Sequence, residues 1–380
     1  MDNMDKQLNN SGLDEDPILS SQQQPNIRSK KTKHKKKTKT KRIFLLYYAL
    51  LILLFVVPVV FIYCGPLAKI NYRPMPVASD NSEFLKQQQE IQKSEFTIDN
   101  DFEDTDSIVI MPTQENLVAI SQANQEIENI AFFGLDVRQE GSQDGRSDII
   151  MILSIDQANK KIRAASILRD CYVQIPGHKK GRINAAYAYG GPALAINTIN
   201  LNFSTDIQKY VKVDFFGMEK IIDMFGGIRL DELSEAEAGQ IRKYLTGSTV
   251  QAGKDVLLNG KEAVLFARIR KIDSDFNRTD RQRAVLQQMA NKLFDMNFGQ
   301  AVALLDQIMP NIETNLTKNE ILSLGWQTMT LGYDKNIEQL RIPTNDAFEF
   351  ANINGASVIL PNIRKNTDAL HKFLYGVESK

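Results

Sequence analysis

The chain has 380 residues, which is enough for one large domain or two medium ones, and its 43% hydrophobic and 24% charged residues are ordinary for a globular protein. The two cysteines and three histidines are scattered along the chain, so a clustered Cys/His zinc site is not expected, and Cys64 and Cys171 lie in such different parts of the chain that a structural disulfide is not expected. The formal net charge is zero, but the charges are unevenly distributed along the sequence.

The first predicted element is a membrane-spanning helix. Residues 28–42 carry ten Lys or Arg and no acid, and residues 43–64 carry no charge at all. Such an uncharged run matches the roughly 20 apolar residues that cross a bilayer, and no small-residue cleavage pattern follows it. The positive-inside rule then predicts a basic, disordered cytoplasmic tail over 1–42 and an extracellular chain from residue 65 onward. A basic run can instead bind nucleic acid, but its position against the span favours an orientation signal that contacts anionic membrane lipid.

After the span, the composition changes from a spacer to a globular domain. Residues 65–105 are typical of a juxtamembrane spacer, and apolar runs of strand length alternate with helical patterns from about Ser107 onward. The expected strands are 130–134, 148–155, 161–167, 207–213 and 337–342. The expected helices are 191–202, 215–225, 259–267, 279–297 and 317–331. Strands alternating with helices predict an α/β fold in which helices cover both faces of a central sheet.

Charged residues gather where the pattern predicts the ends of buried elements. They flank the loop between the first two strands, follow the third strand, end the helix at 259–267, and fill the stretch "DSDFNRTDRQR" that leads into the helix at 279–297. In chain order they are Asp136, Arg138, Arg146, Asp148, Arg169, Asp170, Arg268, Arg270, Asp273, Asp275, Arg278 and Arg281, followed by the polar Gln282. One Arg–Asp pair at a strand end is often a simple ion pair. So many arginines together would repel one another unless an anion lay among them.

These residue types favour phosphoryl transfer. The planar guanidinium of arginine donates two hydrogen bonds at once to a phosphate. Asp136 and Asp148, twelve residues apart at facing strand ends, could hold Mg²⁺, which prefers oxygen ligands and accompanies phosphates. Arginines and a metal ion around a pyrophosphate would position it and neutralise its charge. The sequence lacks the GxxxxGK[ST], GxGxxG and GxSxG motifs, and His178 is the only histidine near the charged stretches, so nucleotide-cradling loops and a serine triad are poorly supported.

Seven stretches, in order and at suitable spacing between about 107 and 310, together resemble the LytR-CpsA-Psr family. They are "GLDVR", "RSDIIM", "SILRDCYVQIPG", "RINAAYAYGGP", "YVKVDFFGMEKIIDMFGGI", "LNGKEAVLFARIRK" and "DSDFNRTDRQR". The sequence departs from the family pattern at Leu168, where proline is usual, and at Asn277, where glycine is usual. The resemblance implies an α/β/α sandwich with a central mixed sheet and an apolar tunnel for a polyprenyl tail. The catalytic core would cover 106–310, and 311–380 would belong to the same extracellular domain.

The resemblance also implies an activity and a set of site residues. Such proteins resemble phosphotransferases that move a glycopolymer from an undecaprenyl-pyrophosphate carrier to a sugar hydroxyl of peptidoglycan. The polymer would be wall teichoic acid, a capsular polysaccharide or a rhamnose-rich polysaccharide. By the same resemblance, Asp136 and Asp148 would bind Mg²⁺ or Mn²⁺. The pyrophosphate and the rest of the polar site would be held by Arg146, Arg169, Arg268, Arg270, Asp275, Arg278 and Gln282, with Arg138 and Asp170 contributing to substrate binding. The general base stays open between Asp148 and Asp275.

Two other functions remain open from the sequence. The same site could hydrolyse a polyprenyl or nucleotide pyrophosphate, with water as the acceptor. A membrane-anchored regulator or scaffold could bind a lipid pyrophosphate without turning it over. Asp136 and Asp148, which could bind a metal ion beside the arginines, are the sequence feature that argues against the scaffold.

Overall fold

The computed structural model describes residues 65–74, 126–137, 139–140, 145–272, 275–330 and 332–376. The predicted tail, the predicted span over 43–64 and most of the predicted spacer lie outside these ranges. No helix in the part of the chain that the structure describes is long and apolar enough to cross a bilayer. The first described segment carries the short helix η1 (Pro66–Lys69) and the strand β1 (Asn71–Tyr72).

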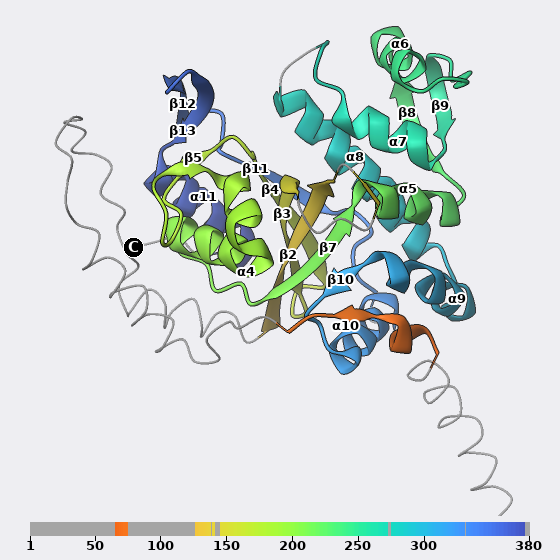
Figure 1. The fold of residues 1–380 in the computed structure, drawn as a ribbon. Helices are drawn as coiled ribbons and strands as arrows, with labels where there is room; N and C mark the ends of the chain where they lie inside the picture. Colours follow the sequence, from red (N-terminus) through yellow and green to blue (C-terminus); the bar gives the residue numbers. More distant parts are fainter. Residues whose placement is uncertain are drawn as a thin grey trace, which may run out of the picture. The chain divides into compact units, whose positions relative to one another are not determined.

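A seven-stranded mixed sheet forms the centre of the domain, in the order β1-β10-β7-β2-β3-β4-β11 (Figure 1). Its other strands are β2 (Ile127–Asp136), β3 (Arg146–Asp156), β4 (Lys161–Ile167), β7 (Lys209–Asp214), β10 (Glu313–Thr314) and β11 (Glu338–Ile342). Strand β2 is antiparallel to β3 and parallel to β7, and β4 is antiparallel to β3 and parallel to β11. The α/β fold with a central sheet is therefore confirmed, and the five predicted strands all lie in it.

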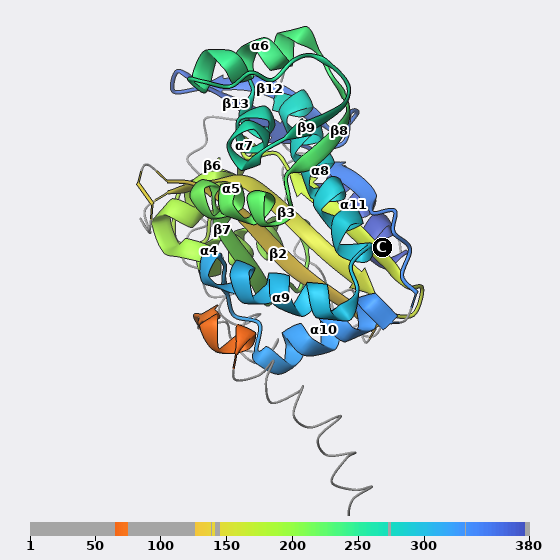
Figure 2. The same ribbon diagram turned by 90° about the vertical axis from the view of Figure 1, so that its right-hand side faces the viewer.

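Helices cover both faces of this sheet, as predicted. Successive side chains of a strand point to opposite faces, and accordingly Phe133 belongs to one apolar core while Phe132 belongs to the other. The first core packs against α4 (Ile183–Phe203) and α11 (Ile363–Tyr375). The second packs against α5 (Phe215–Met224), α7 (Gly260–Arg268) and α8 (Asp275–Phe294). Figures 1 and 2 show the two helical layers on either side of the strands.

The remaining elements extend the two layers. On the α7 side they are β8 (Ile228–Leu233), α6 (Glu235–Tyr244), β9 (Gly253–Leu258), α9 (Phe298–Ile308), the short helix η3 (Met309–Asn311) and α10 (Lys318–Thr330). On the α4 side they are two hairpins, β5 (Tyr172–Val173) with β6 (Gly181–Arg182), and β12 (Phe348–Ile353) with β13 (Ala356–Pro361).

Local sequence explains where the helices that carry the site begin and bend. Asn259 accepts a hydrogen bond from the backbone of Glu262, whose carboxylate accepts one from the backbone of Asn259, and this reciprocal cap starts α7. A Cβ at Gly260 would lie 2.0 Å from the backbone oxygen of Glu219, so only glycine lets α7 approach α5 this closely. In α4, Gly190 and Gly191 have non-helical backbone angles and the helix resumes at Pro192, so the helix expected over 191–202 is the second part of a longer element that begins at Ile183.

The two departures from the family pattern have local consequences. Leu168 is 1% exposed in the first core, and its backbone N–H donates to the oxygen of Ile342 at 2.8 Å, a bond that proline could not make. Asn277 lies in the first turn of α8. The acid-rich stretch from residue 275 is therefore helical rather than a loop that precedes the helix, which corrects the expected start at 279.

Candidate functional site

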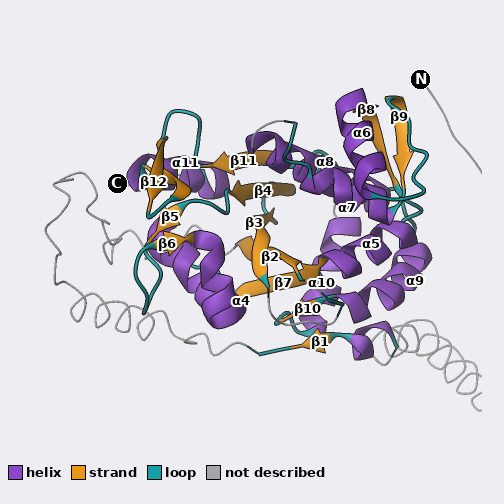
Figure 3. Cartoon of the chain, turned by 45° about the horizontal axis from the view of Figure 1, so that its top comes forward, coloured by secondary structure: helices purple, strands orange, loops and turns teal. Residues whose placement is uncertain are grey.

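The predicted charged stretches converge at one edge of the central sheet. Strands β2, β4 and β7 end at this edge, and β3, which runs antiparallel to β2, begins there. A cavity of about 1060 Å³ opens at these strand ends, between the layer that contains α4 and the layer that contains α5, α7 and α8. Figure 3 brings this end of the strands forward. Residues distant in sequence are thus brought into one site, as crevices at strand ends do in other α/β proteins.

Nine charged side chains line the cavity, six arginines and three aspartates. They are Asp136, Arg146, Asp148, Arg169, Asp170, Arg182, Arg268, Arg270 and Arg278. Arginine cannot lose its charge in a protein, so with ionised carboxylates the lining carries three more positive than negative charges. A site with this balance attracts an anion that bears two or more negative charges.

A β-bulge sets the direction of Asp148. Gly134 of β2 pairs with Ile149 of β3, and the next residue, Leu135, pairs with Ser147, so Asp148 has no partner across the ladder. An extra residue of this kind turns its side chain away from the direction that regular pleating would give. One residue pair beyond the bulge, Asp136 lies opposite Arg146. The bulge therefore allows Asp148 and Asp136 to line the same cavity from neighbouring strands.

Each aspartate of the cavity is bound by arginine. An oxygen of Asp136 accepts from Arg268 at 3.0 Å. The two oxygens of Asp148 face different arginines, Oδ1 with Arg169 at 2.5 Å and Oδ2 with Arg270 at 3.4 Å. These pairs supply the negative charges that let the arginines lie so close together, and they still leave the arginines in excess.

Asp170 connects the cavity to the β5–β6 hairpin. Its carboxylate lies 3.5 Å from Nε of Arg169 and 3.4 Å from Nε of Arg182. Arg182 ends β6 and directly precedes α4. The sequence prediction missed Arg182, although it is the first residue of the quoted stretch "RINAAYAYGGP", and a basic residue at the start of a helix is a signal that could have found it. Asn184 and Phe215 also line the cavity without having been predicted.

Helices α7 and α8 supply the wall opposite that hairpin. Arg268 is the last residue of α7, and its guanidinium lies 4.4 Å from the centre of the Phe215 ring, close enough for a cation–π contact. Arg278 is 2% exposed, and Gln282, one turn farther along α8, donates to the backbone oxygen of Ala267 at 3.4 Å. Arg281 points elsewhere, because it binds Glu237 of α6 and the backbone oxygen of Ile269.

Most of the predicted site residues meet in this cavity. The nine that do are Asp136, Arg146, Asp148, Arg169, Asp170, Arg268, Arg270, Arg278 and Gln282. Arg138 and Asp273 lie outside the described residues, and Asp275 is described only as the first residue of α8. Within the described ranges, no cluster of three or more Asp, Glu, His or Cys side chains could bind a metal ion.

A narrow apolar cavity of about 20 Å³ adjoins the charged one. It shares Phe215, Arg268 and Gln282 with the charged cavity and continues between the sheet and the helices α5, α7 and α8. The rest of its lining is apolar: Phe132, Ile149, Met218, Ile222, Ala263, Val264, Ala267, Val285 and Leu286. The strongly cationic cavity thus shares part of its wall with a small apolar one, so the charged head of an amphipathic anion and the start of its hydrocarbon tail would meet matching surfaces side by side. The apolar space is much smaller than a polyprenyl chain, so these helices would have to move apart to admit one.

The chain is similar to proteins of one family, both in sequence and in structure. The model of the LytR_cpsA_psr family matches residues 79–372. The regulatory protein MsrR of Staphylococcus aureus is 32% identical over 270 residues, which cover 68% of this chain and 79% of MsrR. The polyisoprenyl-teichoic acid–peptidoglycan teichoic acid transferase TagV of Bacillus subtilis is 32% identical over 233 residues, or 58% of this chain and 57% of TagV. Among solved structures, TagT bound to LIIa-WTA superposes with a TM-score of 0.56 at 23% identity, over 67% of this chain and 93% of that one, and so shares the fold.

Proposed function

The chain belongs to the LytR-CpsA-Psr family, and on that premise we propose that it transfers an anionic glycopolymer from an undecaprenyl-pyrophosphate carrier to peptidoglycan. The observation that carries the proposal is the junction of the two cavities at Phe215, Arg268 and Gln282. A polyprenyl pyrophosphate joins a hydrocarbon tail to a doubly charged head, and the two cavities offer a matching pair of environments side by side. TagV, a relative over 58% of the chain, is named for this transfer with teichoic acid.

In the proposed reaction, the arginines of the cavity bind the pyrophosphate and stabilise the charge on its oxygens. Arg169 and Arg270 hold Asp148 between them, so a phosphate oxygen that approaches this group meets preoriented guanidinium donors. A sugar hydroxyl of the acceptor attacks the phosphorus nearest the polymer. The bond from that phosphorus to the bridging oxygen breaks, and undecaprenyl phosphate leaves. The hydroxyl proton passes to a base, for which Asp148 and Asp275 are the candidates.

The aspartates Asp136 and Asp148 are also the proposed ligands of Mg²⁺ or Mn²⁺. Two carboxylates on neighbouring strands give the hard oxygen donors that Mg²⁺ prefers, and two protein carboxylates completed by substrate phosphates and water are a common way to bind it. Bound there, the ion would neutralise developing charge on the phosphate oxygens. Arg268 and Arg270, which contact these carboxylates, are 40% and 42% exposed and so have room to turn from them toward a phosphate.

The proposed location is the cell membrane, with one span at 43–64, the tail 1–42 in the cytoplasm and the catalytic domain outside. The charge pattern of the sequence supports it. A donor with a polyprenyl tail stays in the bilayer, so tethering the enzyme to the same bilayer raises the effective concentration of each for the other.

One incubation separates transfer from its two rivals, pyrophosphate hydrolysis and binding without turnover. The full-length protein in detergent is mixed with a lipid-pyrophosphoryl oligosaccharide and Mg²⁺, with and without a peptidoglycan oligosaccharide. We expect undecaprenyl phosphate to be released only when the acceptor is present. Equal release without acceptor indicates a hydrolase. Binding of the donor without release in either arm indicates a regulator, the role after which MsrR is named.

A further inference from the structure

The β12–β13 hairpin presents an exposed aromatic surface beside the charged cavity. Phe348 and Phe350 lie on one face of β12, because residues two apart in a strand point the same way. Their ring centroids are 5.2 Å apart, and both rings contact Phe276 in the first turn of α8, at 5.3 Å and 6.3 Å. Phe348 packs against the first core, whereas Phe350, nearer the turn, is 67% exposed. We call these three rings the aromatic rim.

The aromatic rim is fixed to the residues of the site. The backbone N–H of Ile359 in β13 donates to the oxygen of Asp170, and Arg182 donates to the oxygen of Ser357 at 2.6 Å. Asp170 and Arg182 both line the charged cavity. The guanidinium of Arg341 lies 4.3 Å from the centre of the Phe276 ring, which holds that ring between β11 and the hairpin. The hairpin is thus hydrogen-bonded to two residues of the cavity wall, and the exposed ring of Phe350 lies on that hairpin outside the lining of the cavity.

The geometry of the proposed reaction indicates which substrate would contact the aromatic rim. In phosphoryl transfer the attacking and leaving oxygens lie roughly in line on opposite sides of phosphorus. The leaving group is the polyprenyl phosphate, and the apolar cavity that would take its tail adjoins Phe215, Arg268 and Gln282. The hairpin contacts the cavity at Asp170 and Arg182 instead. In Figure 3, β5, β6 and β12 lie on one side of the strand ends, and α5 and α7 lie on the other.

From this arrangement we propose that the aromatic rim is a binding subsite for the acceptor glycan, with the ring of Phe350 stacking on the apolar face of an N-acetylhexosamine. The axial C–H groups of a pyranose form a flat apolar face that suits an aromatic ring, and the sugar hydroxyls stay in water. Phe350 exposes a large ring on an element that contacts the site, so its face is available to a ligand there. The inference rests on the proposed transfer, because it assigns the acceptor side of that reaction.

The test compares two substitutions at Phe350 with one elsewhere, all in full-length protein in detergent. F350L keeps an apolar side chain but removes the ring face, and F350W keeps a face. The matched control is W326L, because Trp326 is 61% exposed on α10, which Figures 1 and 2 place at the far end of the domain from the hairpin. We expect F350L to raise the acceptor KM roughly three- to tenfold, as the loss of one aromatic contact would. The donor KM and kcat should stay within about a factor of two, and F350W and W326L should resemble the wild type.

Binding of a peptide-free peptidoglycan tetrasaccharide, measured by calorimetry, gives a readout that does not need turnover. We expect F350L to weaken this binding and W326L to leave it unchanged. An unchanged acceptor KM and an unchanged tetrasaccharide affinity in F350L would overturn the subsite, as would a rise in the donor KM in place of the acceptor KM. Failure of the proposed function looks different. In that case the wild type itself releases no additional undecaprenyl phosphate when acceptor is added, although it still binds the tetrasaccharide.

Discussion

Replacing Arg169 by lysine keeps the positive charge in the cavity and removes the planar fork. Arg169 follows β4, is 14% exposed and holds two carboxylates, with Nη1 2.5 Å from Asp148 and Nε 3.5 Å from Asp170. Lysine can satisfy one of these partners at a time, and a site built for two parallel donors does not accept it as an equivalent. If Arg169 also binds the pyrophosphate, the substitution removes a donor from the reacting group.

The expected size of the effect follows from the bonds that are lost. A charge-assisted hydrogen bond is worth roughly 1.5–3 kcal/mol, and each 1.36 kcal/mol corresponds to about a tenfold change in rate. Losing one such bond to the transition state should therefore lower kcat/KM for the donor by about ten- to a hundredfold. The domain should stay folded, because lysine still neutralises Asp148.

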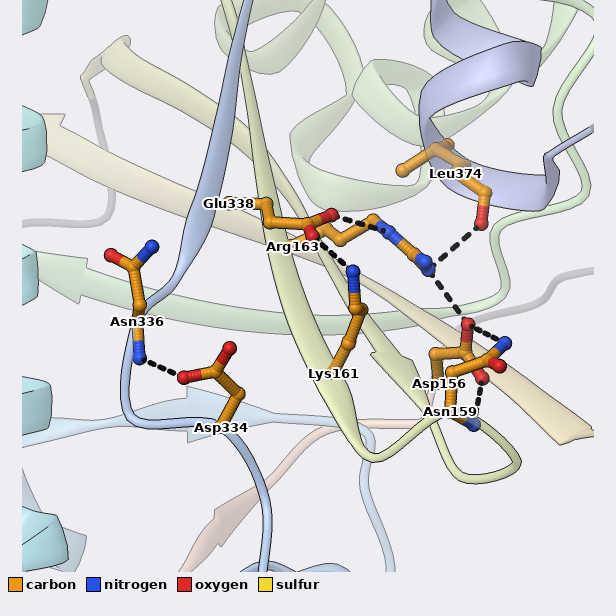
Figure 4. A network of polar contacts seen from close by, with 8 residues as sticks. All are labelled: Asp156, Asn159, Lys161, Arg163, Asp334, Asn336, Glu338 and Leu374. Carbon is orange, nitrogen blue, oxygen red and sulfur yellow. Dashed lines mark hydrogen bonds and ion pairs between the residues drawn. The ribbon is translucent and has the colours of Figure 1, made fainter.

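Arg163, at the other end of β4, is the matched control. It is 13% exposed and also bridges two carboxylates, Asp156 at 2.9 Å and Glu338 at 3.1 Å (Figure 4). Its Nη1 also donates to the backbone oxygen of Leu374, so the group ties β4 to β11 and α11. None of these residues lines either cavity in the described part of the domain. Arg163→Lys should therefore lower the melting temperature by about 2–4 °C per kcal/mol of stability lost and leave the rate of transfer close to that of the wild type.

The assay measures transfer rate and melting temperature for both lysine variants side by side. The reasoning requires the rates to separate the two variants. Arg169→Lys should be slow and Arg163→Lys should keep a rate close to that of the wild type, while both melt somewhat earlier because each loses one of two carboxylate contacts. If Arg169→Lys keeps its rate and melts earlier, like the control, then Arg169 is a structural ion-pair partner and the assignment of the pyrophosphate to this cavity loses its main support.

Three further predictions concern the metal, acid and topology. Asp136→Ala and Asp148→Ala should each abolish transfer without unfolding the domain, and near-full turnover of either variant at saturating Mg²⁺ would contradict the metal assignment. Burial alone would raise the pKa of Asp156, but hydrogen bonds from Asn159 and Arg163 and the charge of Arg163 hold it below the ordinary 3.8. The stabilising contribution of the Asp156 carboxylate should therefore be complete above about pH 4 and fade as the pH falls through the lowered pKa. The difference in unfolding free energy between wild type and Asp156→Asn should shrink on acidification, and a difference that stays constant with pH would refute this. A reporter fused after residue 380 should be active only outside the cytoplasm, and cytoplasmic activity would reverse the predicted orientation.

Periodicity and element ends were sufficient to predict the centre of the fold and much of the site. Charged residues of the cavity follow the apolar runs that became β2 and β4 and precede the run that became β3, so Asp136, Asp148 and Arg169 could be placed at one sheet edge before any pairing was known. The bulge at Asp148 could not be predicted, because it depends on which residues of β2 and β3 face each other. The pairing of each aspartate with a particular arginine is set by the same tertiary arrangement.

Other parts were predictable from signals that went unused. Asn354 and Gly355, both with positive φ, join strands of alternating apolar residues, and an Asn-Gly pair in that setting is a strong hairpin signal. It would have predicted β12 and β13 and thus the aromatic rim. The proximity of Phe276 to this hairpin could not have been read from local sequence, because about 70 residues separate them and their contact depends on how α8 packs.

The product of the reaction distinguishes transfer from every alternative in one measurement. Full-length protein, Mg²⁺, a lipid-pyrophosphoryl oligosaccharide and a peptidoglycan oligosaccharide are incubated, and the acceptor is examined by mass spectrometry. We predict an acceptor that carries the donor oligosaccharide through a single phosphate, with one undecaprenyl phosphate released for each acceptor modified. Free oligosaccharide phosphate beside an unmodified acceptor would contradict the proposed transfer and leave hydrolysis as the activity of this site.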